Sequence, residues 1–324
     1  MKILSNADVA ELLPMAEAID VIDTTMRGVS DGTAQLPLRH VVPVGGANMM
    51  GVMSGSLAEP SCYGVKLVSL FPGNPDKGLS GHRGAVVLFE AETGGAVAMM
   101  DAGLLTAIRT AAASAVATRA LARPDAERLT IIGTGEQAEH HLAAMLAVRP
   151  IAHVHIVGRR AEKAAAMAVH AGHAYPALVI THGTDVQTGI KGADIICTVT
   201  NSATPVLQGA WLEPGQHVNI VGSSVASKRE VDADVVTRCE YFFDYRPSLL
   251  AQAGEIVEGL KAGAFTESDL KSEIGSVLNG APGRSSAQAI TAYRSLGVVA
   301  QDLAAAQHVL DRAVAEGRGQ DASF

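Results

Sequence analysis

The chain has 324 residues, of which 48% are hydrophobic and 18% are charged, and its formal net charge is −8. This composition supplies a large apolar core and excludes intrinsic disorder, and the length favours two domains, with one large α/β domain as the alternative. The acidic balance and the lack of a Lys/Arg cluster argue against nucleic acid or an anionic membrane as a partner.

The sequence shows no targeting or metal-binding signal. No apolar run reaches the ~18–20 residues of a bilayer span, and the N-terminus lacks the apolar core of a signal peptide. The cysteines Cys62, Cys197 and Cys239 are widely separated and form no CxxC motif. We therefore expect no disulfide framework, no bound metal and a reducing, cytoplasmic location.

The first part of the chain predicts two helices and then a run of strands. Asn6 and Asp8 are the expected N-caps of a short helix, and Pro14 suits the first turn of a second helix running to about Gly28. Short apolar segments bounded by Gly, Pro, Asn and Asp predict a mostly antiparallel sheet. These expected strands lie at 36–43, 49–55, 63–71, 85–90 and 96–101. An Ala-rich helix over 104–121 follows and is stopped by Pro124.

After Pro124 the expected strands alternate with helices. The strands lie at 129–132, 153–157, 178–182, 195–199 and 217–221, with later ones at 240–245 and 290–293. The helices cover 136–148, 161–171 and, near the end of the chain, 299–315. This alternation predicts βαβ units and a parallel sheet, so the fold class is α/β.

A glycine turn connects the first strand and helix of this parallel region. The sequence LTIIGTGEQAEHHL places Gly133-Thr134-Gly135 after an apolar strand, and Ala138 is the small third residue. The first glycine permits a tight turn, the second lets backbone approach a pyrophosphate, and Ala138 lets the helix pack on the strand. The pyrophosphate would lie on the helix N-terminus, at Glu136. The turn therefore predicts a nicotinamide dinucleotide, with a simple βα turn as the alternative.

The end of the second parallel strand predicts the phosphate state of this cofactor. An NAD-preferring site places an acid there for the ribose 2′-hydroxyl. This chain reads VHIVGRRAEKA, with Gly158, Arg159 and Arg160 at that point. Two guanidiniums suit a 2′-phosphate, so we expect NADPH, with NADH as the alternative cofactor. Arginines that simply face solvent are the alternative interpretation.

Several blocks in the right order resemble the ornithine cyclodeaminase/mu-crystallin family over nearly the whole chain. They are GVKLVSLFPGNPDKGLSGHRGAVVLFEAETGGAVAMMD (64–101), TAIRTAAASAVATRALARP (106–124), IIGTGEQA (131–138), CTVTNSATPVL (197–207), NIVGS (219–223) and AYRSLGVVAQDLAAA (292–306). The resemblance implies a Rossmann-type NADP-binding domain, residues 122–297, inserted in a smaller α+β domain. Residues 1–121 and 298–324 would form that substrate-binding and dimerisation domain, and a homodimer is expected.

The resemblance also implies a substrate site. Lys66 lies in an apolar strand, where a lysine is unexpected unless it is paired or functional, and a solvated strand edge is the alternative. In the family, residues matching Arg39 and Lys66 hold the substrate carboxylate. Met53 and Leu296 are expected to line the pocket, although a methionine at strand spacing is also ordinary core.

The expected cofactor contacts come from the glycine turn, from the ends of parallel strands and from family matches. In an open parallel sheet, ligands bind outside the carboxyl ends of the strands. The full set is His82, Arg109, Thr110, Gly133, Gly135, Glu136, Gln137, Ala138, Arg159, Arg160, Thr198, Val199, Thr200, Val221, Gly222, Ser223, Ser224, Lys228, Ser295 and Gly297. A surface position is the alternative for Lys228, and a structural role is the alternative for His82.

Ser224 separates two kinds of chemistry within the family. Cyclodeaminases and the related alanine dehydrogenase carry an aspartate at this position, which serves as the acid/base. A serine hydroxyl cannot act as a general base unaided. Serine resembles the ketimine-reductase branch, so we expect NAD(P)H-dependent reduction of a small cyclic 2-imino acid. The substrate would be Δ1-pyrroline-2-carboxylate or Δ1-piperideine-2-carboxylate, and the proton would come from Lys66, Ser224 or an ordered water.

Two other functions stay open from the sequence. The chain could be an ornithine cyclodeaminase or an alanine-dehydrogenase-like oxidoreductase. It could also be a binding protein that holds NADPH and a small acid without turnover. The sequence contains no HExxH, no GxSxG and no GxxxxGK[ST], and its His140-His141 and His153/His155 pairs do not make a metal signature.

Overall fold

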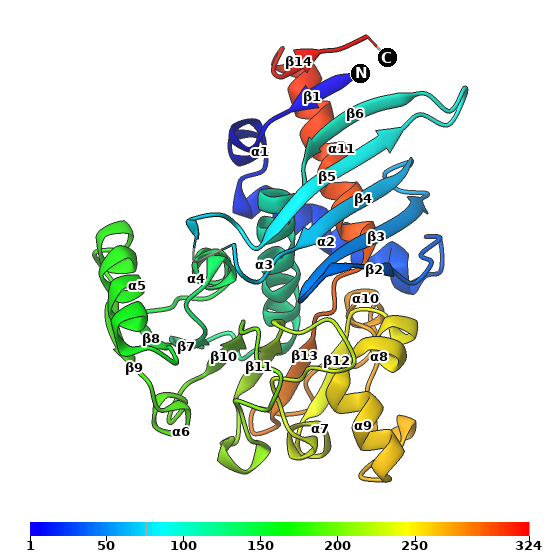
Figure 1. Ribbon diagram of the computed structural model, residues 1–324. Coiled ribbons are helices and arrows are strands. Elements are labelled where there is room, and N and C mark those ends of the chain that lie inside the picture. The colour runs from blue at the N-terminus through cyan, green and yellow to red at the C-terminus, as the bar shows by residue number, and fades with distance from the viewer. Residues whose placement is uncertain (75–76, 324) are drawn as a thin grey trace. The chain divides into compact units, whose positions relative to one another are not determined.

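The computed structural model describes residues 1–74 and 77–323 (Figure 1). Pro75 and Asp76, which fall in the family block at 64–101, lie outside the described residues. The chain divides into two compact units. Unit 1 is Met1–Ala112 with Val298–Phe324, and unit 2 is Ala113–Gly297. The domain boundary after Leu121 stays a prediction, since the contacts divide the chain within a helix, after Ala112.

Unit 1 is built on one seven-stranded sheet, sheet A, whose strand order is β14-β1-β6-β5-β4-β3-β2. Its strands are β1 (Lys2–Leu4), β2 (His40–Gly45), β3 (Asn48–Leu57), β4 (Cys62–Leu70), β5 (His82–Phe89), β6 (Ala96–Asp101) and β14 (Gln320–Asp321). Only β1 and β6 pair in parallel among the described strands of sheet A. The mostly antiparallel sheet is therefore confirmed.

The helices of unit 1 pack on sheet A or on one another. They are α1 (Asn6–Leu12), α2 (Met15–Ser30), the start of α3 (Ala102–Leu121) and α11 (Val299–Ala315). Helix α11, red in Figure 1, packs on β3, β4, β5 and α2. Its buried side chains include the polar pair Gln301 and Asp302 among apolar residues.

Three local predictions for unit 1 need correction. The N-cap of α1 is Ser5, not Asn6 or Asp8, because Ser5 Oγ accepts the Asp8 amide while the Asp8 carboxylate accepts the Ser5 amide. The first strand was expected at 36–43 but begins at His40; Pro37 has no N–H for a ladder. Strands β1 and β14 were not predicted, because two or three residues show no periodicity.

Unit 2 contains a second seven-stranded sheet, sheet B, in which every described pair is parallel. The strand order is β12-β13-β11-β10-β7-β8-β9. These strands are β7 (Arg128–Ile132), β8 (His153–Val157), β9 (Val179–Gly183), β10 (Ile195–Thr198), β11 (His217–Ile220), β12 (Glu240–Phe243) and β13 (Thr291–Arg294). The strand order reverses between β7 and β10. In a doubly wound sheet, the ligand crevice is expected at the carboxyl ends of the two strands where this reversal occurs.

The helices of unit 2 connect these strands. They are α4 (Glu136–Val148), α5 (Ala161–Ala174), α6 (Val186–Gly189), α7 (Ala233–Arg238), α8 (Arg246–Gln252), α9 (Gly254–Ala262) and α10 (Ile274–Leu278), with 3-10 turns η2 (Gly209–Trp211) and η3 (Glu267–Asp269). The predicted α/β fold class with a parallel sheet is confirmed, and every predicted strand after Pro124 is present. Helices α6 to α10 were not predicted.

Candidate functional site

A buried cluster of charged side chains lies in unit 1, between sheet A and α11. Lys66 on β4 is 2% exposed, and its Nζ donates to Asp302 Oδ1 at 2.8 Å. Arg109 on α3 donates to the same oxygen through Nε at 2.9 Å. Its Nη1 donates to Gln301 Oε1 at 2.8 Å. We call Lys66, Arg109 and Asp302 the cation cluster, because two basic groups share one carboxylate.

The local fold forces Lys66 to face this cluster. Along β4, Lys66 points to the same side as Val68 and to the opposite side from Leu67, because strand side chains alternate. Its register partners are Met53 on β3 and Val86 on β5, both buried. Lys66 is thus a basic residue in an apolar row beneath α11, and Asp302 supplies the negative charge that it contacts.

Burial and charge set the protonation of the cluster. Burial lowers the pKa of Lys66 to about 7; Asp302 opposes this effect, while Arg109 and Arg39 add to it. For Asp302, burial acts to raise the pKa, but Arg109 and Lys66 hold it below its ordinary value. Asp302 Oδ2 is buried and, within the described residues, has no hydrogen-bond partner. The cluster therefore carries an excess of positive charge with an ammonium that titrates near neutrality.

Two further predicted residues lie near this cluster in unit 1. Arg39 is half-buried, and its charge reaches Lys66. Desolvation, followed by the charges of Lys66 and Arg109, lowers the pKa of His82 to about 4, although part of its surface stays exposed. The two nearby cations alone favour the neutral form, so His82 is an uncharged donor or acceptor at pH 7.

The glycine turn in unit 2 has the geometry that a dinucleotide requires. Gly133 has φ +133°, and a Cβ there would lie 2.8 Å from the Val199 carbonyl oxygen, so only glycine fits. A Cβ on Gly135 would meet nothing within 4 Å, which leaves open space at the start of α4. Gly135 caps α4 without a side-chain hydrogen bond, and Ala138 is fully buried. The residues present fit a pyrophosphate at this helix N-terminus.

The end of β8 lies beside the same turn. A Cβ on Gly158 would approach Thr134 Cγ2 to 2.8 Å. Arg159 and Arg160 follow and are exposed, and Arg160 Nε lies 3.6 Å from Glu162 Oε1. An exposed pair at this distance is weak, so both guanidiniums are available to an anion.

Sequence reasoning missed a fully buried carboxylate, Glu230, at the carboxyl ends of β10 and β11. Its Oε1 accepts hydrogen bonds from Thr200 N at 2.6 Å and Thr200 Oγ1 at 2.7 Å. Its Oε2 accepts from Thr198 Oγ1 at 2.9 Å and Gly222 N at 2.5 Å. Glu230 belongs to the charged stretch SKRE, which reads as surface in the sequence, and so no local signal could have found it.

Two more buried charges hold segments that follow the parallel strands: Asp244 holds the segment after β13, and Arg294 holds the segment after β11. Asp244 accepts hydrogen bonds from Leu296 N at 2.6 Å and Gly297 N at 2.7 Å. Arg294 donates to Ser223 O at 2.7 Å and lies 2.6 Å from Glu255 Oε1. Ser295 Oγ is buried and has no partner among the described residues. An orphaned hydroxyl at this point fits a ligand that supplies the missing hydrogen bond.

The remaining predicted cofactor residues differ in exposure. Thr110, Val199, Val221 and Ser223 are buried, Ser224 and Gln137 are half-buried, and Glu136 is exposed. Lys228 is half-buried, and its Nζ donates to Asn201 Oδ1 at 2.6 Å, so it links the segments after β10 and β11. The substrate-site predictions Met53 and Leu296 are both buried, in units 1 and 2 respectively.

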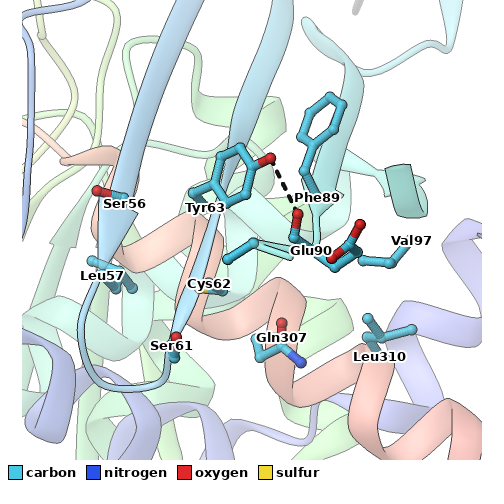
Figure 2. Close-up of a pocket in the computed structure, with 11 residues that line it drawn as sticks. Ser56, Leu57, Ser61, Cys62, Tyr63, Phe89, Glu90, Val97, Gln307 and Leu310 are labelled. Atoms are coloured by element: carbon cyan, nitrogen blue, oxygen red, sulfur yellow. Dashed lines mark hydrogen bonds between the residues drawn. The ribbon is translucent and has the colours of Figure 1, made fainter. Parts of the chain in front are cut away.

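A separate hollow of about 480 Å³ lies in unit 1, away from every predicted site residue (Figure 2). Figure 2 shows Tyr63 and Phe89 on one side and Gln307 and Leu310 on the other, and the Tyr63 hydroxyl donates to the Glu90 carbonyl at 3.2 Å. The Glu90 carboxylate accepts hydrogen bonds from its own turn, including Thr93 N and Gly95 N. It therefore serves the β5–β6 turn rather than a ligand.

Within residues 1–74 and 77–323, no group of three or more His, Cys, Asp or Glu side chains is placed to hold a metal ion. None of their helices is long and apolar enough to cross a membrane.

Comparison with known proteins identifies relatives over the full chain. A sequence profile described as the Ornithine cyclodeaminase/mu-crystallin family matches residues 1–317. Delta(1)-pyrroline-2-carboxylate reductase of Bacillus cereus is 32% identical over 329 residues, which cover 100% of both chains. Ketimine reductase mu-crystallin of Mus musculus is 33% identical over 87% of this chain and 86% of its own.

Solved structures give the same result for the fold. Delta(1)-pyrroline-2-carboxylate reductase of Thermococcus litoralis, solved with NADH and L-proline, has a TM-score of 0.96, with 29% identity over 99% of this chain and 100% of its own. An archaeal alanine dehydrogenase dimer with bound NAD has a TM-score of 0.93, with 29% identity over 100% of this chain and 99% of its own.

Proposed function

Because the chain belongs to the ornithine cyclodeaminase/mu-crystallin family, we propose that it is an NAD(P)H-dependent reductase of a small cyclic 2-imino acid. The observation that carries this proposal is the cation cluster, in which Lys66 and Arg109 share the single carboxylate of Asp302. A buried excess of positive charge is costly, and the carboxylate of an imino acid offsets that cost. The relatives named as reductases support the same reaction class.

The cofactor is held by unit 2 in this proposal. The N-terminus of α4, opened by Gly133 and Gly135, would bind the pyrophosphate. Ser295 and the segments that follow β10 and β11 would contact the nicotinamide. When bound, the reduced cofactor supplies the hydride that converts the C=N carbon of the imino acid to C–H.

We propose a preference for NADPH over NADH. Arg159 and Arg160 are exposed at the position where NAD-preferring sites carry an acid, and they offer two guanidiniums to a 2′-phosphate. The solved relatives hold NADH or NAD, so we expect NADH to serve as a weaker alternative.

Lys66 is the proposed proton donor as well as a carboxylate ligand. Its pKa of about 7 lets the ammonium exist and release a proton at neutral pH, which a serine hydroxyl such as Ser224 cannot do. A bound carboxylate adds negative charge beside Lys66 and raises its pKa, so substrate binding favours the protonated form.

The substrate we favour is Δ1-pyrroline-2-carboxylate, reduced to L-proline, with Δ1-piperideine-2-carboxylate, reduced to L-pipecolate, as the larger homologue. Relatives in both the sequence and the structure comparison carry the five-membered ring in their names. Ser224, where cyclodeaminases and alanine dehydrogenase carry an aspartate, favours imine reduction over deamination.

We also propose that the chain forms a homodimer through the face of sheet A that α11 does not cover. Register pairing places Val65, Val87 and Met99 in one row, on the same face as Leu67. Leu67 and Met99 are 38% and 37% exposed. An apolar sheet face of this kind is typical of a subunit interface, and the similar alanine dehydrogenase is a dimer.

The test is oxidation of NADPH and NADH against a panel of cyclic and acyclic imino acids. We expect turnover of the five- and six-membered cyclic imino acids, with higher kcat/KM for NADPH. Lys66→Met removes the ammonium and with it a charged contact to the substrate. The resulting loss in kcat/KM should correspond to an increase of at least about 2–3 kcal/mol in activation free energy. The exposed Lys191→Met is the matched control. Tight NADPH binding without turnover of any imine would contradict the proposal, as would unchanged kcat/KM in Lys66→Met.

A further inference from the structure

Three segments of unit 2 that follow parallel strands are proposed cofactor contacts, at 198–200, 221–224 and 295–297. Most of their backbone N–H groups donate inside the protein, including those of Ser295, Leu296 and Gly297. Val199 N donates to Ile132 O and Val221 N to Thr198 O. Thr200 N and Gly222 N both donate to the Glu230 carboxylate. These N–H groups are therefore not available to a ligand, which would have to bind carbonyl oxygens or side chains that these contacts leave accessible.

That arrangement matches the chemistry of a nicotinamide ring. Its carboxamide NH₂ group is a donor that needs acceptor oxygens, and carbonyls held in place provide them. Backbone carbonyl oxygens keep a fixed direction when the neighbouring N–H groups of the same segment are hydrogen-bonded inside the protein. Among the described residues, Glu230 accepts such hydrogen bonds from the segments after β10 and β11.

Glu230 joins the two segments by hydrogen bonds. The side chain is fully buried, and its two oxygens accept four hydrogen bonds. A Cβ on Gly222 would lie 1.9 Å from the Thr200 carbonyl oxygen and 2.6 Å from Glu230 Oε1. The backbones after β10 and β11 are thus in direct contact over this carboxylate, and only glycine fits between them.

The bonding pattern requires a carboxylate and not its neutral amide. Burial raises the pKa of Glu230, while the hydrogen bonds from Thr200 and Gly222 and the charge of Arg294 oppose this effect. Each oxygen faces a backbone N–H, which can only donate. A side-chain NH₂ at either position would meet another donor.

We infer that Glu230 is a positioning residue that fixes the segments after β10 and β11 in the geometry that accepts the nicotinamide ring. The inference rests on the proposed function, because it assumes that unit 2 binds a nicotinamide cofactor. Glu230 acts through Thr200 and Gly222 and does not itself touch the cofactor. Its removal should therefore weaken cofactor binding more than it weakens binding of the imino acid.

The test variant is Glu230→Gln, which keeps the shape of the side chain and places an NH₂ against either Thr200 N or Gly222 N. We expect the Kd for NADPH, measured by fluorescence titration, to rise about tenfold or more, because two donors then face each other in a buried site. The KM for NADPH should rise in parallel, while the KM for the imino acid at saturating cofactor should change little. A merely structural role would not produce this split.

The matched control is Asp232→Asn, two residues along the same segment. Asp232 Oδ1 accepts hydrogen bonds from Gly209 N at 2.9 Å and Val235 N at 3.2 Å, and both lie outside the three cofactor segments. This variant should lose thermal stability and still bind NADPH with the wild-type Kd. An unchanged Kd in folded Glu230→Gln, or an equal loss of affinity in Asp232→Asn, would overturn the inference.

A milder variant covers the case in which Glu230→Gln does not fold. Thr198→Val removes one hydroxyl donor from Glu230 Oε2, and Thr198 is fully buried, so it has no contact with solvent to lose. A smaller rise in the Kd for NADPH is expected, and no rise contradicts the inference. If the wild-type chain binds neither NADPH nor NADH, the proposed function itself fails and the inference fails with it. Failure of the inference alone leaves wild-type binding intact.

Discussion

At the scale of single residues, the sequence indicated which basic side chains to examine but not what holds them. A lysine in an apolar strand was expected to be paired or functional, and Lys66 is buried, as that expectation requires. Its partner Asp302 is 236 residues away along the chain, so no local pattern could join the two. Gln301 and Asp302 did interrupt an apolar helix, and that polar pair was a signal that sequence reasoning passed over. The roles of Arg39, Lys66 and Ser224 stay predictions.

The protonation of Lys66 gives a prediction at this scale. Asp302 raises the pKa of Lys66, while burial and the charges of Arg109 and Arg39 lower it, and His82, neutral at pH 7, adds no charge. If protonated Lys66 is required, kcat/KM for the imino acid should be constant below pH 7 and fall above it. In Asp302→Asn the fall should begin about 1–3 pH units lower, since the stabilising negative charge is gone.

The pH profile of kcat/KM with saturating NADPH measures this effect. The control is Asp311→Asn, an exposed aspartate on the same helix α11, which should keep the wild-type profile. A profile in Asp302→Asn that breaks at the wild-type pH would show that Asp302 does not set the proton affinity of the catalytic group.

At the scale of elements, the parallel region was predicted best because its signals are local. The glycine turn, its flanking apolar strand and the helix that begins at Glu136 lie within one continuous stretch. Helices α7 to α10 were not predicted because they are short, between five and nine residues, and depend on packing rather than on periodicity. Glu230 lies in the loop between β11 and α7, so its contacts with Thr200 and Gly222 become visible only in three dimensions.

One helix end depends on a single side chain, and this dependence can be tested. The Arg149 guanidinium donates to the carbonyls of Thr118, Arg119 and Ala122, the last ones of α3 and just beyond, at 2.8, 3.0 and 2.9 Å. The Thr118 carbonyl also accepts from Ala122 N at 2.9 Å, whereas the last carbonyls of a helix ordinarily lack backbone partners, so Arg149 adds hydrogen bonds at this helix end. We expect Arg149→Met to lower the free energy of unfolding by about 2–3 kcal/mol in denaturant titrations. The exposed Arg128→Met should change it little, and equal losses in both variants would refute the capping role.

At the scale of the whole chain, the sequence supported two domains and the family resemblance supported an insertion. The structure divides into a discontinuous unit 1 and a continuous unit 2, and each holds one part of the proposed site. The substrate role of the first and the cofactor role of the second remain proposals. Composition and periodicity could not predict that the two stretches of unit 1 join, because the whole of unit 2 separates them along the chain.

The proposed dimer is tested by placing a charge on the uncovered face of sheet A. Leu67→Glu puts a carboxylate at the centre of that face, and its desolvation should make association unfavourable. Light scattering after size-exclusion chromatography should then report a monomer. Val169→Glu is the control, because Val169 is 60% exposed on α5 in unit 2. A Leu67→Glu variant that stays dimeric would move the interface elsewhere.

The most direct test of the proposed reductase activity follows the hydrogen that is transferred. Wild-type protein would be incubated with Δ1-pyrroline-2-carboxylate and NADPH carrying deuterium at both C4 positions of the dihydronicotinamide, and the product would be analysed by chiral chromatography and mass spectrometry. We expect L-proline with deuterium at C2, and much less of this product from Lys66→Met. Release of ammonia from ornithine without net NADPH oxidation, or no labelled product from any cyclic imino acid, would contradict the proposed activity.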